Sequence, residues 1–230
     1  MPHSANQLIA RLPPDARLRL DAIGEVVELA LSQVLGLPRA PTLHVHFPID
    51  GFISLLAQID GDHAMEVGMV GREGMLGIQV ALGVATDPLR SLVQGEGHAL
   101  RIDAGEFRAE IARTPALRLV IDRYVVVLLA QHARAAACLR FHRIEERLAR
   151  WLLMSQDRAT SASFTVTQEF LAYMLGVRRV SVTVAAGSLQ RQRLIAYERG
   201  RMTVVDREGL ERAACSCYAS DRAVYREVWS

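Results

Sequence analysis

Lysine is absent from this 230-residue sequence, cysteine is scarce, and no long apolar run occurs. All 27 basic residues are therefore arginine, whose planar guanidinium suits phosphate and guanine recognition. Three cysteines, an odd number, argue against a disulfide framework and fit a reducing compartment. The most apolar stretch, residues 117–131, is interrupted by Asp122 and Arg123 and is too short to span a bilayer. The N-terminus lacks a signal-peptide pattern, so we expect a cytoplasmic protein with no membrane partner.

Charge is distributed unevenly along a chain that is long enough for two modest domains. Half of the residues are apolar, which excludes a disordered chain. The formal net charge is only +2, but residues 140–230 contain 15 arginines and ten acidic residues. The remaining residues contain 12 arginines and 15 acidic residues. The basic charge therefore lies in the C-terminal part.

The first half changes its hydrophobic period near Thr42. Residues 4–35 favour short helices around Pro13 and Pro14, with apolar residues at Leu8, Leu12, Leu18, Ile23, Val26 and Val27. From Thr42, apolar and polar residues alternate in "TLHVHF", and "GFISLLAQI", "HAMEVGMV" and "GHALRI" are further short segments bounded by turn residues. This pattern predicts an antiparallel β-roll, or jelly roll, within residues 1–114.

Residues 115–140 form a long helical pattern that begins at Pro115. Its apolar stripe advances in alternating steps of four and three residues, as in a heptad seam. Two interpretations stay open: a helix packed on its own domain, or a dimerisation helix in a homodimer. The second interpretation places at the dimer interface Leu117, Ile121, Tyr124, Leu128, Gln131, Ala135 and Cys138. A second helix follows, with its stripe at Ile144, Leu148, Trp151 and Leu152.

The segment "TVTQEFLAYMLGVRRVSVTVAAGSLQRQRLI" predicts a helix-turn-helix. Thr167 is the expected N-cap of the first helix, and Gly176 ends it where a left-handed residue is needed. The second helix runs from about Arg178 to Gln192, with its inner face formed by Val182, Ala185, Ala186 and Leu189. Two short β-runs around Arg199 and Gly200 follow and predict a wing. The fold class is thus α+β, with domains at 1–114, 115–140 and 141–230.

The start of the second helix is the expected DNA-reading edge, because that end enters the major groove in such units. Arg179 has the reach for guanine, while hydroxyl groups suit phosphates or base edges. The expected DNA contacts are Arg178, Arg179, Ser181, Thr183, Thr167, Gln168, Arg199 and Arg201. A helical hairpin with a solvated arginine face is the alternative.

Taken together, the sequence resembles the Crp/Fnr superfamily of bacterial transcription regulators. "LPPDARLRLDAIGEVVELALSQVL" resembles its N-terminal helical entry, "HVHFPIDGFISLL" and "VGREGMLG" its sensory β-roll, 115–140 its dimer helix, and the last third its winged helix-turn-helix. The resemblance implies a homodimer that binds a double-stranded DNA operator, with RNA polymerase as a further partner and no enzymatic activity.

Departures from the family pattern concern the effector and the operator. Members that bind cyclic nucleotides hold the ribose with a glutamate, and here Met75 follows Gly74 at that position. Arg90 and Ser91 match the phosphate-binding pair but come after a longer insert. The resemblance therefore implies a β-roll that does not bind a cyclic nucleotide in the usual way. No cysteine precedes Cys138, which excludes the N-terminal iron–sulfur cluster of one branch. Relatives carry charged readers where this chain has Val180 and Val184, so a different operator is expected.

Two other constellations suggest different chemistry. His44 and His46 alternate along one strand, and with Asp50 and His98 they are the basis of the alternative function, a cupin-like jelly-roll metalloenzyme with an accessory helical domain. Cys215 and Cys217 form a Cys-Ser-Cys that lacks further ligands nearby in the sequence, which favours packing or exposed thiols. At a seam position, Cys138 would face its own counterpart in a parallel dimer. Neither the histidine group nor the Cys-Ser-Cys motif is favoured as a metal site, so we expect no metal and no cofactor.

Overall fold

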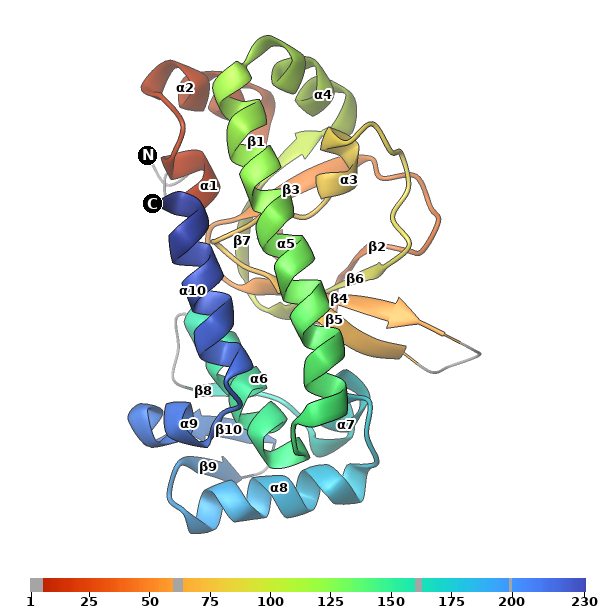
Figure 1. Cartoon of the computed structure of the whole chain (residues 1–230). Coiled ribbons are helices and arrows are strands. Elements are labelled where there is room, and N and C mark those ends of the chain that lie inside the picture. Colours follow the sequence, from red (N-terminus) through yellow and green to blue (C-terminus); the bar gives the residue numbers. More distant parts are fainter. Residues whose placement is uncertain (1–5, 60–63, 160–162, 199) are drawn as a thin grey trace. The chain divides into compact units, whose positions relative to one another are not determined.

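The computed structural model describes residues 6–59, 64–159, 163–198 and 200–230 (Figure 1). Contacts divide the chain into two compact units, the first comprising residues 1–57 and 69–128 and the second residues 58–68 and 129–230. The division falls inside the long helix α5 (Pro115–Phe141). Each unit is described by itself below.

The first unit is built on antiparallel β-strands, as the alternating pattern predicted. One sheet has the order β1-β7-β3 and another the order β2-β6-β4-β5. In the first sheet, Val45 lies opposite Ile102 and Phe47 opposite Leu100, and all four side chains are buried. The strands of these two sheets are β1 (Gly24–Leu29), β2 (Val34–Gly36), β3 (His44–Pro48), β4 (Phe52–Gln58), β5 (Ala64–Val70), β6 (Arg90–Gly95) and β7 (Gly97–Asp103), and residues 64–68 of β5 are grouped with the second unit.

The N-terminal prediction of helices was wrong for residues 24–29. The described part begins with α1 (Gln7–Ala10) and α2 (Pro14–Ile23), but β1 follows at once and pairs with β7 along its whole length. Val26 and Val27 are therefore strand residues, because β-branched side chains fit the pleat and β7 offers a partner edge. Leu43, the first apolar residue of the alternating segment, is 66 % exposed just before β3.

Helices of the first unit close its core. Besides α1 and α2, this unit contains α3 (Ile78–Ala81) and α4 (Ala104–Arg113), and the Asp103 side chain caps α4 by accepting from the backbone N–H groups of Gly105 and Glu106. From α4, Phe107 packs edge-to-face on Phe47, with ring centroids 5.8 Å apart. This helix had no counterpart in the sequence-based prediction.

The second unit contains the remaining helices and a small sheet with the order β8-β10-β9. Its core includes the predicted stripe residues Leu148, Trp151 and Leu152. The elements are α6 (Ile144–Ala159), β8 (Ser163–Thr165), α7 (Gln168–Leu175), α8 (Arg179–Arg191), β9 (Ile195–Glu198), β10 (Arg201–Val204), α9 (Arg207–Ala213) and α10 (Cys217–Trp229).

Helix α5 has the predicted extent but buries the stripe that was assigned to a dimer interface. Leu117, Ile121, Tyr124 and Leu128 are at most 9 % exposed in the single chain, and Cys138 is 2 % exposed. Gly74 approaches Tyr124 so closely that a Cβ at this position would collide with the phenol. These contacts favour the interpretation of a helix packed on its own domain for this stripe. Gln131 and Ala135 are half-buried.

None of the described helices is by itself long and apolar enough to cross a membrane. The pair α7 and α8 reaches the required length and composition only together, and the two helices are bent by 107° relative to each other.

Candidate nucleic-acid interface

Two helices joined by a short glycine turn form the centre of the site, as the sequence predicted. The Thr167 side chain caps α7 by accepting from the backbone N–H of Phe170 at 3.1 Å. Gly176 ends α7 with φ 63°, a left-handed conformation that costs glycine little. Its N–H bonds the carbonyl of Tyr173, and the N–H of Val177 bonds that of Ala172. The chain therefore leaves α7 at a defined angle and enters α8 three residues later.

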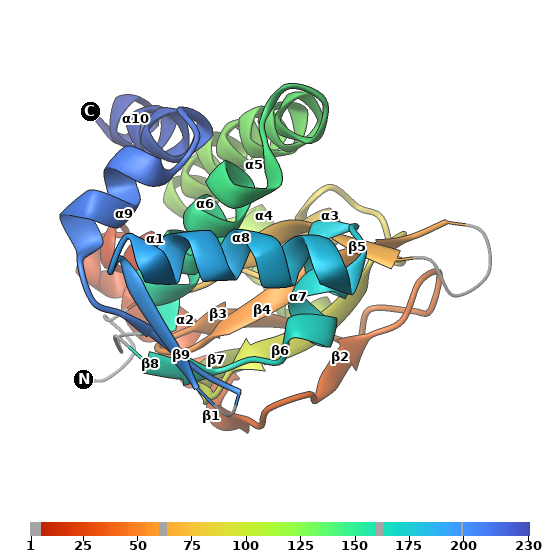
Figure 2. The same cartoon turned by 90° about the horizontal axis from the view of Figure 1, so that it is seen from below.

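The second helix, α8, has one apolar face turned inward. The four predicted inner residues are all at most 4 % exposed: Val182, Ala185, Ala186 and Leu189. Burying each larger side chain contributes about 2 kcal/mol, which fixes the rotation of the helix about its axis. Figure 2 shows α8 crossing the lower face of this unit, with α7 alongside its N-terminal end.

The opposite face of α8 is exposed and begins with the two arginines. Arg178 stands at the N-cap position and Arg179 opens the helix, and both are exposed. Val180 and Val184 are 64 % and 65 % exposed on the same side of the helix. Ser181 is half-buried, whereas Thr183 is exposed. The first two turns thus present guanidinium, hydroxyl and methyl groups together.

A hydrogen bond joins the two helices at this surface. The Thr183 hydroxyl donates to Oε1 of Gln168 at 2.6 Å. Gln168 is the first residue of α7, next to the capping residue Thr167. The start of α7 and the second turn of α8 therefore form one continuous polar surface, on which α7 also presents its N-terminal N–H groups.

The wing lies beside these helices and has the predicted hairpin form. β9 pairs with β10, with Tyr197 opposite Met202, and β8 adds a third strand that the sequence-based prediction missed. Gly200 at the turn has φ 81°. Arg201 is exposed at the start of β10, while Arg199 lies outside the described residues.

A shallow depression connects α7, α8 and the wing. Burial raises the pKa of the Tyr197 phenol, and the hydroxyl donates to the Val166 carbonyl at 2.9 Å. The phenol therefore stays protonated at neutral pH and fixes β9 against the segment before α7. The depression is lined by Thr167, Gln168, Glu169, Arg179, Tyr197 and Gly200.

Comparison with known domains identifies this unit. A family model described as the Crp-like helix-turn-helix domain matches residues 146–213. The chain carries a Crp-like helix-turn-helix domain. Its match begins within α6 and ends at the last residue of α9, so it contains both helices and the wing. No curated protein matches the sequence.

Solved structures extend the likeness to both units. The c-di-GMP-responsive global regulator CLP of Xanthomonas campestris has a TM-score of 0.68 at 16 % identity, covering 84 % of this chain and 99 % of its own. FixK2 of Bradyrhizobium japonicum has a TM-score of 0.64 at 13 % identity, with 84 % and 98 % covered. A Crp/Fnr-family regulator of Thermus thermophilus has a TM-score of 0.62 at 20 % identity, with 84 % and 99 % covered. The chain thus has the α+β fold of Crp/Fnr transcription regulators, which confirms the resemblance found in the sequence.

Of the four expected effector residues, Ser91 lines the cavity found in the first unit. This cavity has a volume of about 420 Å³, and Gly74, Met75 and Arg90 are not among its lining residues. Met75 is 1 % exposed and belongs to the core. Gly74 is explained by its close approach to Tyr124. The cavity is lined by residues of β2, β3 and the segment between them, together with residues of α3, β6 and the chain around them, including Thr42, His44, His46, Gln79, Asp87 and Ser91.

Two residues that line this cavity also carry buried polar atoms. Neither Nδ1 of His46 nor Oε1 of Gln79 has a hydrogen-bond partner within the described part of the chain. Burial, together with the charges of His44 and Arg101, lowers the pKa of His46 to about 4. The imidazole is therefore neutral at pH 7 and offers one donor and one acceptor nitrogen.

The histidine constellation proposed for a metalloenzyme is only partly assembled. His44 and His46 have ring centroids 6.4 Å apart, and Asp50 lies instead beside His98, with Oδ1 3.3 Å from Nδ1. Among the described residues, metal-binding geometry is found for one group of side chains, and these four do not belong to it. The geometry therefore gives no support to the cupin-like alternative.

Proposed function

We propose that the protein is a homodimeric transcription regulator that binds a specific double-stranded DNA operator and acts on RNA polymerase. The observation that carries this proposal is the surface of α8, where buried apolar residues on one side orient exposed arginines on the other. The match of residues 146–213 to a Crp-like helix-turn-helix domain supports it. In such domains the second helix enters the major groove with its N-terminal residues on base edges.

Sequence readout is assigned to the first two turns of α8. Arg179 has the planar fork that reads guanine O6 and N7, and Thr183 can donate to a base edge once DNA replaces Gln168 as its acceptor. The exposed methyl groups of Val180 and Val184 suit thymine methyls, a contact that needs no hydrogen bond. The operator is therefore expected to combine a guanine with flanking thymines in each half-site.

Phosphate binding is assigned to groups around this reading edge. Thr167 and Gln168 stand at the N-terminus of α7, where backbone N–H groups and the helix dipole favour an anion. Arg178 and Arg201 are exposed on either side, and Arg199 is proposed from the sequence alone. Such contacts carry no base preference, but they make binding dependent on salt.

Dimerisation is assigned to a different stripe of α5 than the sequence suggested. A second apolar stripe of α5 is solvent-exposed. It contains Leu119, Val126 and Leu129, which are 53–65 % exposed, and continues with Ala133 and Ala136. Their spacing follows seven, three, four and three residues, which keeps them on one side of a helix. In a two-fold dimer this seam would hold two copies of α8 about 34 Å apart, the spacing of successive major grooves.

The β-roll is assigned a sensory role without the usual cyclic-nucleotide site. Met75 replaces a ribose acceptor and is buried, and Arg90 is not on the cavity wall, so a phosphate there would lack its cation. The neutral His46 and the amide of Gln79 favour a small uncharged polar effector.

The proposal is tested by selecting operators from genomic DNA and measuring affinities for operator and unrelated duplexes. Replacing Arg179 with Ala is expected to weaken operator binding by about 1–3 kcal/mol while unrelated DNA is bound as before, so that selectivity falls by at least about tenfold. Arg201→Ala should weaken both kinds of DNA equally and lower the salt slope by about one.

Arg226→Ala in α10 is the charge-matched control, because this exposed arginine is not part of the proposed DNA surface. It should leave selectivity unchanged. If Arg179→Ala keeps its selectivity, Arg179 does not read the bases. If the wild-type protein prefers no operator, the proposed function is wrong. Sedimentation of the wild-type protein as a monomer on its operator would overturn the dimer.

A further inference from the structure

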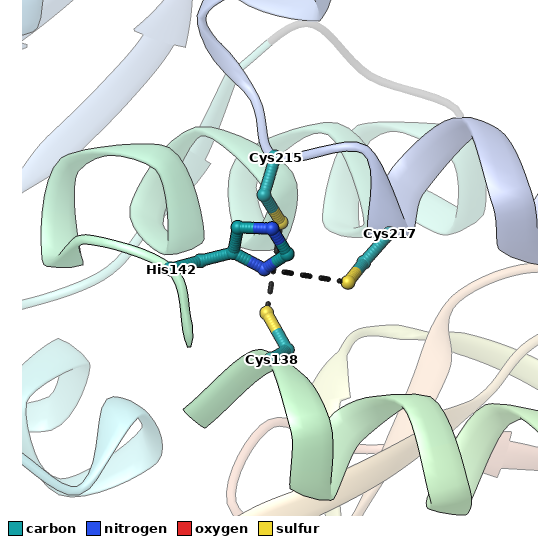
Figure 3. A group of neighbouring side chains, drawn as sticks. All are labelled: Cys138, His142, Cys215 and Cys217. Atoms are coloured by element: carbon teal, nitrogen blue, oxygen red, sulfur yellow. Dashed lines mark hydrogen bonds between the residues drawn. The ribbon is translucent and has the colours of Figure 1, made fainter. Parts of the chain in front are cut away.

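Four side chains with metal-binding atoms gather within the second unit (Figure 3). Cys138 lies near the end of α5 and His142 directly after it, while Cys215 comes from the segment between α9 and α10 and Cys217 is the first residue of α10. Each offers one ligand atom, and these atoms all lie within 4.8 Å of one another. The three cysteines are buried, and His142 is half-buried. No single segment of the sequence carries all four residues. The Cys-Ser-Cys motif therefore has no further ligands nearby in the sequence.

The separations are those of ligands around one small ion. The Sγ atoms of Cys138 and Cys215 are 3.6 Å apart, and Sγ of Cys217 is 3.5 Å from Nδ1 of His142. A tetrahedral zinc ion with bonds of about 2.3 Å to sulfur and about 2.0 Å to nitrogen places two sulfurs about 3.8 Å apart and a sulfur and a nitrogen about 3.5 Å apart. The side chains therefore stand close to the positions of a tetrahedral shell.

We propose that these four side chains bind one zinc ion in a structural site, with ligands Cys138, His142, Cys215 and Cys217. Three thiolates and one imidazole are a donor set typical of structural zinc. All four positions are supplied by the chain, so the ion has no open position for substrate. The ion would join the end of α5 to the start of α10.

Local structure holds each ligand in place. Cys138 and His142 are four residues apart, on one side of the helix, and the His142 N–H bonds the Cys138 carbonyl at 3.1 Å. The Cys215 N–H bonds the carbonyl of Glu146 in α6 at 3.3 Å, and its own carbonyl accepts from Tyr218 in α10 at 3.1 Å. The ligands therefore stand on backbone that is already fixed by other hydrogen bonds, as a preformed metal site requires.

Positive charge nearby suits an anionic zinc centre. Three thiolates and a divalent ion leave one net negative charge, and Arg147 and Arg150 of α6 both interact electrostatically with Cys138. Arg150 also pairs with Asp221 at 2.8 Å, which holds its guanidinium in this region.

Two other uses of the cysteines fit the geometry less well. A disulfide between Cys138 and Cys215 would use two thiols and leave both Cys217 and His142 without a role, and all three cysteines are free in the structure. An iron–sulfur cluster binds its thiolates through several irons, which keeps ligand atoms farther apart than the 4.8 Å limit found here.

The first experiment measures metal in untagged full-length protein purified without chelator or added metal. Elemental analysis is expected to find about one zinc per chain, whereas protein without zinc, or with iron in its place, would overturn the proposal. Cobalt(II) added to the chelator-stripped protein should give the strong visible absorption of tetrahedral thiolate coordination. A weak octahedral spectrum would count against the site and needs no variant protein.

The second experiment assigns the ligands. Cys217→Ser and His142→Gln are expected to lower zinc affinity by at least about tenfold, and Cys217→His, which restores a donor, should retain more zinc than Cys217→Ser. The matched control is His44→Gln, which alters a histidine of the first unit and should leave the zinc content unchanged. Retention of full zinc by both ligand variants, or equal loss in the control, would refute the assignment.

Discussion

His46 in the first unit and Asp221 in the second unit are both buried, but they differ in how their polar atoms are paired. In the first unit, His46 is 6 % exposed and its Nδ1 has no hydrogen-bond partner in the described part of the chain. In the second unit, Asp221 is 9 % exposed and receives two arginines, Arg134 at 2.6 Å and Arg150 at 2.8 Å. Two histidines also differ in their surroundings: His142 lies among three thiols, whereas His46 lines a cavity.

This contrast separates a receptive site from a structural one. A buried group without a partner costs free energy, which a ligand that reached the group would recover, and this property suits the effector role proposed for the first unit. In the second unit, the paired charges around Asp221 and the proposed zinc ligands hold the helices that carry them in fixed positions. A sensor needs the first property, and a DNA-reading helix needs the second.

The largest expected effect of a single substitution in this comparison is at Asp221. Replacing it with Asn removes the negative charge between two largely buried guanidiniums, which is expected to lower the free energy of unfolding by about 3–5 kcal/mol. The control is Asp122→Asn in the first unit, whose partner Arg118 is 2.8 Å away but about half exposed. That change should cost at most about 1 kcal/mol. Chemical denaturation measures both, and equal losses would mean that the Asp221 cluster is as well solvated as a surface pair.

Acid is expected to lower the free energy of unfolding through His46 in the first unit. Its pKa is about 4 in the folded chain and 6.5 in the unfolded chain, so only the unfolded chain binds the proton between these values. Stability is therefore full above pH 6.5 and falls as the pH is lowered toward 4, by about 3 kcal/mol. Urea denaturation of wild type and His46→Gln at pH 7 and pH 4 isolates this contribution. Parallel pH dependences of the two proteins would show that His46 takes up its proton in the folded state.

The helix-turn-helix was predictable because its signals are local. Thr167, Gly176 and the inner residues of α8 act within a few positions of each other, so cap, turn and face can be read from spacing. Strand β1 was missed because its conformation depends on β7, more than 60 residues away in the chain. The short strand β8 needs β10 in the same way.

The heptad pattern of α5 is a real periodicity, and its stripe is largely buried within the single chain. The helix has two apolar stripes, and sequence alone does not say which one its own domain buries. Tyr124, which contacts Gly74, belongs to the first stripe, and the exposed Val126 and Leu129 belong to the second. The Cys3His group was missed for a related reason: Cys138 and Cys215 are 77 positions apart, and only the folded chain brings them together. The signal that was available is the four-residue spacing of Cys138 and His142 combined with Cys-Ser-Cys.

The smallest effect concerns two helix caps, one in each unit. Thr167 caps α7 and Asp103 caps α4, and replacing either with Ala should lower the free energy of unfolding by about 1 kcal/mol. The two changes should differ in DNA binding, because Thr167 also lies on the proposed phosphate-binding surface and Asp103 does not. Thr167→Ala is expected to weaken operator and unrelated DNA alike, by less than Arg201→Ala does, while Asp103→Ala leaves both affinities unchanged. Thermal denaturation and fluorescence anisotropy measure the two quantities on the same samples. If Thr167→Ala lowers stability without changing DNA affinity, the N-terminus of α7 is a helix cap alone and the phosphate contacts belong to the arginines.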